Sequence, residues 1–521
     1  MTNTAPATAG NGAPPDSLKE TLISIVIAFA LAFVGRSYVI EPFVIPTGSM
    51  APTLNGAHMR FFSPASGFQW DANPRDGART GDAPLPVQGA RRSGNPIVVT
   101  DPVTGVPMRR FDVPLRAGDR ILVLKYLYAL FGPQRFDVVV FKNPENPQEN
   151  FIKRLLGLPG EELWICDGDL FVREPDSDHP ARRRWHIARK PHRVQQTVWW
   201  PVFSSEYTPI DSALTGEPWR GPWAGDGWST EGLTYRADSA DPGDLRWDSE
   251  RWPITDRTPY NEPVRGIMGI QSFPVSDVRM RLGVEPDSPG GTVAATLTAR
   301  GHEFQGVLED GHAVVRMRPI GADDWTVLDD RAAPMPEPGA VTPVVFTHAD
   351  QTLTLRVAGR VVASGEYHWT PEERLAFATD PALADRRGAL AQARAYRRPT
   401  AAWSFTGSPV TLHRIGLDRD LYWRTERGRD GAEYARATGP GDTFQLHAKE
   451  YFMCGDNSPS SRDSRLWTGV DPWVAATIDD DVGVVHRDLI MGRAFFVYFP
   501  SPHQNLGPVP VPDFGRLRFI K

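Results

Sequence analysis

EPFVIPTGSMAPTL, residues 41–54, follows directly on the one apolar segment of this sequence that approaches membrane length. Pro46, Gly48 and Pro52 bracket Ser49 and leave little room for a regular helix or a central strand. Such a stretch presents its serine hydroxyl rather than burying it, so Ser49 is a candidate nucleophile. An ordinary turn serine is the alternative, and partner residues elsewhere in the chain decide between the two.

A second stretch supplies a candidate base. Residues 138–141 (VVVF) predict a buried strand and residues 143–147 a turn, after which a second apolar strand begins at Phe151 and contains Lys153. A lysine in such a strand either snorkels at an edge or is held in apolar surroundings. Burial disfavours the charged amine, so a buried Lys153 could take the proton of a serine hydroxyl.

The third stretch is GDNSPSSRDSR, residues 455–465, which follows the apolar residues 451–454. Asp463 and Arg465 can form an ion pair, and Ser461 can aim its hydroxyl at a neighbouring amine. Taken alone, this stretch would be interpreted as a solvated polar loop.

Together the three stretches resemble the type I signal peptidases, serine-lysine proteases that cut leader peptides from exported proteins. The matching segments follow the family's motifs in order and in residue type. They are residues 46–54, 136–161 and 451–465, and residues 489–498 resemble the family's last strand. The resemblance covers under half of the chain, roughly residues 18–57, 115–170 and 445–500. It implies a mainly β catalytic body on one N-terminal transmembrane helix, with no cofactor and no metal.

The resemblance also implies roles for individual residues. Ser49 attacks the scissile carbonyl, and Lys153 acts as general base and returns the proton to the leaving amine. Ser461 is expected to bond the lysine amine, while Asp463 and Arg465 hold that loop in place.

Two further features of the site follow from the resemblance. The oxyanion hole combines the backbone N–H of Ser49 with the hydroxyl of Thr47, where many relatives carry serine. The walls of the pockets for substrate residues −1 and −3 are bulky and apolar, so the pockets are shallow and fit Ala, Gly or Ser; the wall residues are Phe43, Ile45, Met50, Leu54, Val140, Phe151 and Ile152. A plain core role is the alternative for each of them. The leader is expected to bind as an added extended strand.

Residues 18–40 predict the transmembrane helix, because residues 21–35 are free of charge and Arg36 can snorkel toward a headgroup. A cleavable export signal is the alternative, but cleavage so close to Ser49 would damage the site. We expect residues 1–17 to form a disordered cytoplasmic tail. The expected location is the bacterial inner membrane, with one span and an extracytoplasmic catalytic domain. Signal peptides of preproteins, the lipid bilayer and the export translocon are the expected partners.

Composition limits the function classes. With 521 residues, 23% of them charged, and a formal net charge of −6, the chain is not expected to bind nucleic acid. Cys166 and Cys454 are the two cysteines, and neither lies in a CxxC or Cys/His cluster, so a structural zinc site is unsupported. A disulfide between them and two free thiols both remain open, and the second is favoured.

The catalytic body is expected in two parts, residues 41–172 and 444–521, with a loop insertion of two short strands at 57–115. Residues 173–443 form a large insertion. Within it, alternating apolar residues predict a β-sandwich over about residues 265–420, similar to concanavalin-like or laminin-G-like jelly rolls. We expect this module to contact the body through few residues.

A scaffold or docking role is favoured for the sandwich over carbohydrate binding. The rival interpretation of the whole chain is an envelope or carbohydrate-binding membrane protein on a peptidase-derived scaffold. The presence of Ser49, Lys153, Ser461, Asp463 and Arg465 together argues against it.

Overall fold

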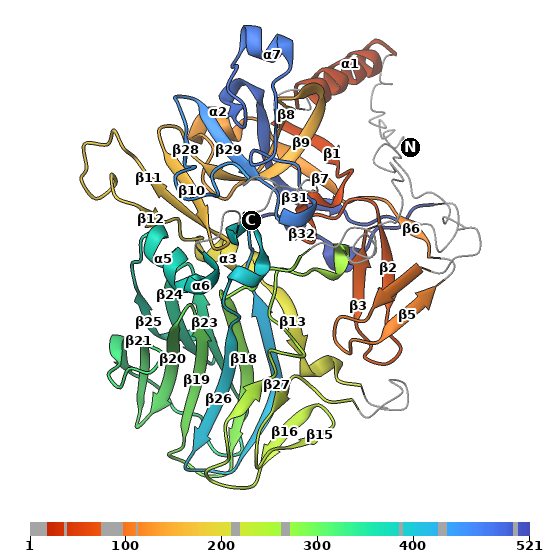
Figure 1. Cartoon of the computed structure of the whole chain (residues 1–521). Coiled ribbons are helices and arrows are strands. Elements are labelled where there is room, and N and C mark those ends of the chain that lie inside the picture. Colours follow the sequence, from red (N-terminus) through yellow and green to blue (C-terminus); the bar gives the residue numbers. More distant parts are fainter. Residues whose placement is uncertain are drawn as a thin grey trace, which may run out of the picture.

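The computed structural model describes residues 18–35, 39–73, 97–110, 113–209, 219–261, 271–384, 389–425, 435–503 and 509–521. The described chain is mainly β, as predicted. Figure 1 shows the strands at both ends of the chain gathered in the upper part of the molecule, which we call the body. The middle of the chain forms the sandwich below it, and β2, β3 and β5 lie to one side.

The main sheet of the body interleaves strands from the two ends of the sequence. Its order is β1-β7-β31-β8-β9-β29-β30, and β32 pairs with β31. The bounds are β1 Ile40–Val44, β7 Arg120–Leu124, β8 Val138–Asn143, β9 Asn146–Gly157, β29 Glu450–Cys454, β30 Val485–His486, β31 Ile490–Phe499 and β32 Arg518–Phe519. The two apolar strands predicted around Lys153 are therefore confirmed as the antiparallel pair β8–β9.

A second sheet of the body marks where the insertion leaves and returns. Its order is β12-β11-β10-β28, so β28, which follows the insertion, pairs beside β10, which precedes it. The bounds are β10 Glu162–Cys166, β11 Asp169–Arg173, β12 His186–Ile187 and β28 Phe444–Gln445. Short helices complete the body: α2 Leu127–Phe131, α3 His192–Val198 and α7 Pro472–Thr477.

The insertion contains two antiparallel sheets packed on one core. One has the order β15-β16-β27-β18-β23-β24-β25 with β13 on β27, and the other has the order β14-β17-β26-β19-β20-β21-β22. The bounds are β13 Trp200–Ser204, β14 Trp223–Ala224, β15 Ser229–Glu231, β16 Thr234–Ala237, β17 Leu245–Trp247, β18 Val278–Pro286, β19 Thr292–Ala299, β20 His302–Glu309, β21 His312–Pro319, β22 Thr326–Ala332, β23 Thr342–Ala349, β24 Thr352–Val357, β25 Arg360–Glu366, β26 Thr400–Thr406 and β27 Val410–Arg419.

The sandwich arises from strict alternation of apolar and polar residues. In β24, Leu353, Leu355 and Val357 are buried while their neighbours are half-buried, as expected for a strand with one face on a core. The sheets also recruit β13–β17, which lie N-terminal to the predicted sandwich range. Between β25 and β26 run helices α5 Pro371–Ala378 and α6 Pro381–Ala384, and the break between them falls just before Pro381, which has no backbone N–H to continue the first helix.

Segment 57–115 has, in its described residues 57–73, 97–110 and 113–115, more regular structure than predicted. It forms a three-stranded sheet, β3-β2-β6, and a hairpin, β4–β5, rather than an irregular loop with two strands. The bounds are β2 His58–Phe62, β3 Gln69–Ala72, β4 Ile97–Thr100, β5 Pro107–Arg110 and β6 Leu115–Arg116. Buried Phe61, Trp70 and Val99 give it a small core of its own, which an irregular loop would lack.

The N-terminal helix α1 covers Leu18–Val34, and the chain is already in strand β1 at Ile40. The helix is thus shorter than the predicted 18–40, because Ile40 to Val44 pair with β7. Among the described residues, no helix has the length and apolar character required to cross a membrane. The predicted tail, residues 1–17, and Arg36 lie outside the described residues.

A buried ion network joins the body to the sandwich. Asp167 lies in the turn between β10 and β11, and Arg300 lies in the turn between β19 and β20. Arg300 Nε is 2.6 Å from Asp167 Oδ2, and its Nη1 is 2.6 Å from Asp277 Oδ1. Arg374 on α5 bonds Asp167 at 2.9 Å and Asp169 at 2.5 Å. The prediction that the insertion contacts the body through few residues is therefore wrong.

Candidate active site

Ser49 lies in a single 3-10 turn, η2 Gly48–Met50, between β1 and β2. Pro46 and Pro52 flank this turn as the sequence indicates, and the Leu54 N–H donates to the Met50 carbonyl at 2.8 Å to close the loop. Ser49 is 8% exposed. The expectation that this loop leaves the serine unburied is therefore wrong, because the Ser49 hydroxyl faces Lys153 of the main sheet rather than bulk solvent.

Lys153 comes from β9, opposite Val139 on β8. Its side chain is buried, and Nζ donates to Ser49 Oγ at 2.5 Å. Phe151, on the same face of the strand, places its ring 5.4 Å from the amine. The structure therefore brings together the two residues that the sequence singles out from segments about a hundred positions apart.

Burial sets the protonation of this amine. It lowers the pKa of Lys153 from 10.5 to about 8, while the charge of Asp463 acts in the opposite direction. A lysine with a pKa near 8 is neutral in a substantial fraction of molecules at mildly alkaline pH. The pair therefore has the geometry and the proton affinity for Lys153 to deprotonate Ser49.

The 455–465 loop surrounds this pair. Asp463 accepts from Ser461 Oγ at 2.6 Å and from Arg465 Nε at 2.9 Å, and the Gly455 N–H donates to it at 2.9 Å. Burial raises the pKa of Asp463, but Arg465 more than offsets this and holds that pKa below its usual value. The carboxylate is thus charged and braces the loop. The predicted bond from Ser461 to the Lys153 amine stays a prediction.

The sequence analysis did not single out Arg154 and Asp456, which form a second, fully buried ion pair beside the site. Arg154 follows Lys153 in β9, and its Nε and Nη2 each lie 2.7 Å from the Asp456 carboxylate. Thr53 donates to the same carboxylate at 2.6 Å. The pair therefore ties the Lys153 strand, the Ser49 loop and the 455–465 loop together. The sequence could have pointed to this pair, since Arg154 lies in the matching segment 136–161 and Asp456 in the matching segment 451–465.

The predicted pocket residues are apolar and fall in two separate hydrophobic clusters. Six of the seven belong to one cluster, in which Phe43 packs against the buried side chains of Ile45, Met50, Leu54, Val140 and Ile152. Phe151 belongs to the neighbouring cluster. Thr47, the predicted oxyanion donor, precedes the 3-10 turn and is exposed.

Two residues of the insertion reach the site, and the sequence analysis missed both. Tyr260 and Asn261, at the end of the 3-10 turn η6 Pro259–Asn261, are buried against the Ser49 and 455–465 loops. No local pattern marks them, because their partners lie about 200 positions away along the chain.

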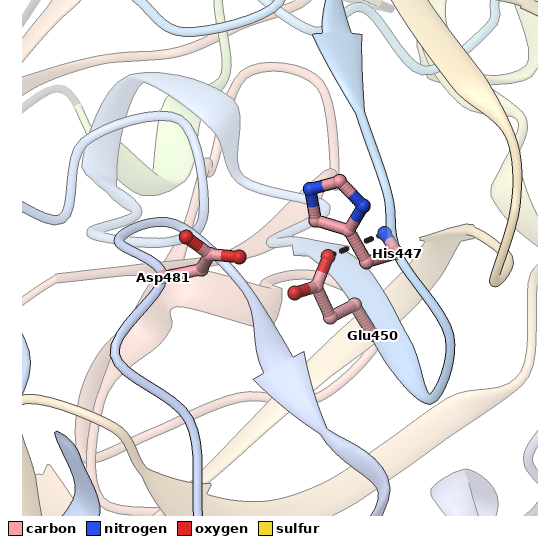
Figure 2. A group of neighbouring side chains, drawn as sticks. All are labelled: His447, Glu450 and Asp481. Atoms are coloured by element: carbon pink, nitrogen blue, oxygen red, sulfur yellow. Dashed lines mark hydrogen bonds between the residues drawn. The ribbon is translucent and has the colours of Figure 1, made fainter. Parts of the chain in front are cut away.

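Two groups of side chains among the described residues have the spacing to hold a cation. Asp169, Asp277 and Asp350 lie together, but Arg374, Arg300 and Lys190 already pair with these three carboxylates. Figure 2 shows the other group, His447, Glu450 and Asp481, beside the β28–β29 turn. Burial raises the pKa of Glu450 to about 7, and Asp481 adds to the rise. Neither group includes a residue of the Ser49–Lys153 pair.

Cys166 and Cys454 are both buried and free, so the favoured expectation of two unpaired thiols is confirmed.

Comparison with known proteins finds one family whose model matches three segments of this chain. The model of the family described as "Signal peptidase, peptidase S26" matches residues 18–79, 97–202 and 412–499. The match therefore leaves out most of the sandwich. Signal peptidase I of Aquifex aeolicus is 43% identical over 58 residues, which cover 11% of this chain and 23% of that protein. Signal peptidase I of Pseudomonas fluorescens is 28% identical over 143 residues, covering 27% and 33%. The chain spans about a third or less of the length of these curated relatives.

A carbohydrate binding module, CBM66 from Bacillus subtilis, covers 38% of this chain and 95% of its own, at 9% identity and a TM-score of 0.22, a likeness too weak to support an inference. The S26 match, by contrast, includes Ser49, Lys153 and the whole 455–465 loop, and the matched relatives are signal peptidases. Over these matched segments the chain is similar to the S26 signal peptidases.

Proposed function

We propose that this chain is a membrane-bound serine endopeptidase that removes N-terminal signal peptides from exported preproteins with a Ser49–Lys153 dyad. The observation that carries the proposal is the 2.5 Å contact between Lys153 Nζ and Ser49 Oγ in a buried setting. A structural lysine would instead be paired with a carboxylate or extended to solvent.

The reaction follows from this contact. Lys153 takes the Ser49 proton as Ser49 Oγ attacks the scissile carbonyl, and then gives the proton to the leaving amine. Water hydrolyses the resulting acyl-enzyme with Lys153 again as base. The Ser49 N–H and the Thr47 hydroxyl stabilise the oxyanion; in other hydrolases the loss of one such donor costs about 3–4 kcal/mol of transition-state stabilisation.

The membrane part of the proposal rests on α1. Val26, Phe29, Leu31 and Phe33 are all more than 60% exposed on this helix, which water would disfavour. We assign these side chains to contact with lipid, with the body on the extracytoplasmic side, where signal peptides emerge from the translocon. Fractionation of cells that express the full chain tests this assignment, since a chain recovered free of membranes would contradict it.

Cleavage should depend on the neutral form of Lys153. Because the pKa of Lys153 is about 8, kcat/KM for a peptide without ionisable side chains should rise with pH up to about 8. At pH 6 it should be roughly 100-fold below its plateau, the fraction of neutral amine two pH units below the pKa. The charge of Asp463 raises the Lys153 pKa, so Asp463→Asn should move this acid limb to lower pH. A value of kcat/KM that does not fall between pH 8 and pH 6 would exclude Lys153 as the base.

Substrate selection should follow the apolar wall. Peptides with Ala at −1 and −3 should be cut, and the same peptides with Leu or Phe at −1 should not, as mass spectrometry of the products would show. Ile45→Ala combined with Ile152→Ala should allow Leu at −1, because both side chains belong to the wall. The control is Ile165→Ala, the same isoleucine-to-alanine truncation made once in a different buried cluster. Unchanged preference in a folded double variant would remove these side chains from the pockets.

A further inference from the structure

The insertion reaches the backbone of the nucleophile loop. Tyr260 lies so close to Gly48 that a Cβ at that glycine would stand 2.2 Å from Tyr260 Cε1. The Tyr260 carbonyl also accepts from the Asn73 N–H at 2.7 Å, which fixes this turn of the insertion to the β3 end of the body. Residue 48 therefore has to be glycine because of a side chain that the insertion supplies.

Asn261, the next residue, forms a reciprocal amide pair with Asn457 of the 455–465 loop. Asn261 Nδ2 donates to Asn457 Oδ1 at 2.7 Å, and Asn457 Nδ2 donates to Asn261 Oδ1 at 2.9 Å. Asn261 is 4% and Asn457 is 1% exposed. A paired amide this deeply buried has one orientation, because rotation would leave its polar atoms without partners.

Asn457 in turn holds the two carbonyls around the nucleophile. Its Nδ2 donates to the Gly48 carbonyl at 2.8 Å, and its backbone N–H donates to the Ser49 carbonyl at 3.0 Å. Both hydrogens of the Asn457 amide are thus used, one on Gly48 and one on Asn261. The orientation of that amide decides whether the Gly48 carbonyl stays bound.

The Gly48 carbonyl and the Ser49 N–H belong to the same planar trans peptide unit, in which they point in opposite directions. A side chain that grips the carbonyl therefore also fixes where the N–H points. The Ser49 N–H is the backbone donor of the proposed oxyanion hole, whose contribution depends on its aim at the developing charge.

We infer that Asn261 is a positioning residue, which acts through Asn457 to fix the direction of the Ser49 backbone N–H. This inference rests on the proposed function. It makes the insertion a working part of the active site: without Asn261, the Asn457 carbonyl oxygen loses its donor in a buried setting, and the amide that holds Gly48 is free to turn.

The test compares three variants in peptide cleavage: Asn261→Ala, Asn457→Ala and the double variant. Asn261→Ala should lower kcat by about 10- to 100-fold with KM nearly unchanged, as expected for a misdirected transition-state donor. The acid limb of the pH profile should stay in place, because the Ser49–Lys153 contact is untouched. Since Asn261 acts through Asn457, the double variant should be no slower than Asn457→Ala.

Gln305→Ala is the matched control, because it removes a side-chain amide that pairs with Thr296 and Arg316 on the outer face of the sandwich. It should leave kcat unchanged. Asn261→Asp keeps the size and the acceptor but cannot donate to Asn457, so it should lower kcat even if the alanine variant folds poorly. Each kcat is divided by the fraction of folded protein, which circular dichroism measures.

Three outcomes would overturn the inference: unchanged kcat per folded Asn261→Asp enzyme, a loss confined to KM, or strictly additive effects in the double variant. A wild-type chain that cuts no leader peptide would instead refute the proposed function itself.

Discussion

Lys153→Ala enzyme is expected to fold and to reach its normal location, yet to cleave a leader peptide at least about 10⁴-fold more slowly than the wild type, a loss typical of a removed dyad or triad member. Ser49→Ala should be equally inactive. The fold should persist because the amine is buried at a cost in solvation, and Asp463 keeps its bonds to Arg465 and Ser461 without it. Product formation and thermal unfolding measure the two effects separately.

The matched control is Lys142→Ala. Lys142 lies on the neighbouring strand β8, but its side chain is exposed and its Nζ contacts the Pro147 carbonyl. Its loss should leave the rate unchanged. Substantial cleavage by folded Lys153→Ala or Ser49→Ala would end the dyad assignment, whatever the family of the chain.

Arg300→Ala should produce the largest loss of stability, about 3–5 kcal/mol in the free energy of unfolding, the usual result of removing one partner from a buried ion network. Arg300 is 2% exposed and bonds Asp167 of the body and Asp277 of the sandwich. Without Arg300, the buried carboxylates of Asp167 and Asp277 lose part of the positive charge that balances them. Urea unfolding followed by tryptophan fluorescence measures the loss.

Arg236→Ala provides the comparison. Arg236 makes bonds of similar length to Asp287 and Asp238, but both acids are exposed. Solvent screens such pairs, so its loss should change stability little. Equal effects of the two substitutions would show that the buried network adds nothing beyond a surface pair. Two separate unfolding transitions in the wild type would show that the body and the sandwich are not coupled.

The contact between Ser49 and Lys153 could be predicted because each of the two residues carries a local signal. Prolines and a glycine define the Ser49 loop, and apolar runs define the strands β8 and β9 that carry Lys153. The sandwich strands have the same kind of signal, namely alternation, and β18, β24 and β27 fall where the alternation predicts them. The pattern of apolar residues in the sequence therefore predicts most of the β architecture.

The interface between body and insertion had no such signal. Arg300, Arg374 and Asn261 are polar residues that a single sequence assigns to the surface, and their burial depends on partners more than a hundred positions away. The strands of segment 57–115 were missed in part for a related reason. The segment is rich in glycine, proline and arginine, which favour an irregular loop. This composition obscures the short apolar runs that form β2 and β3.

The pairing of β9 with β29 also sets the earliest point during synthesis at which the complete site can form. Arg154 and Asp456 are 302 positions apart, so at roughly 5–20 residues per second the ribosome needs about 15–60 s to make the chain between them. Throughout that interval Ser49 and Lys153 exist without Asp463 and Asn457, which brace them in the finished protein. The bonds that Asp456, Asn457 and Asp463 make at the site can therefore form only after residues 455–465 have been synthesised.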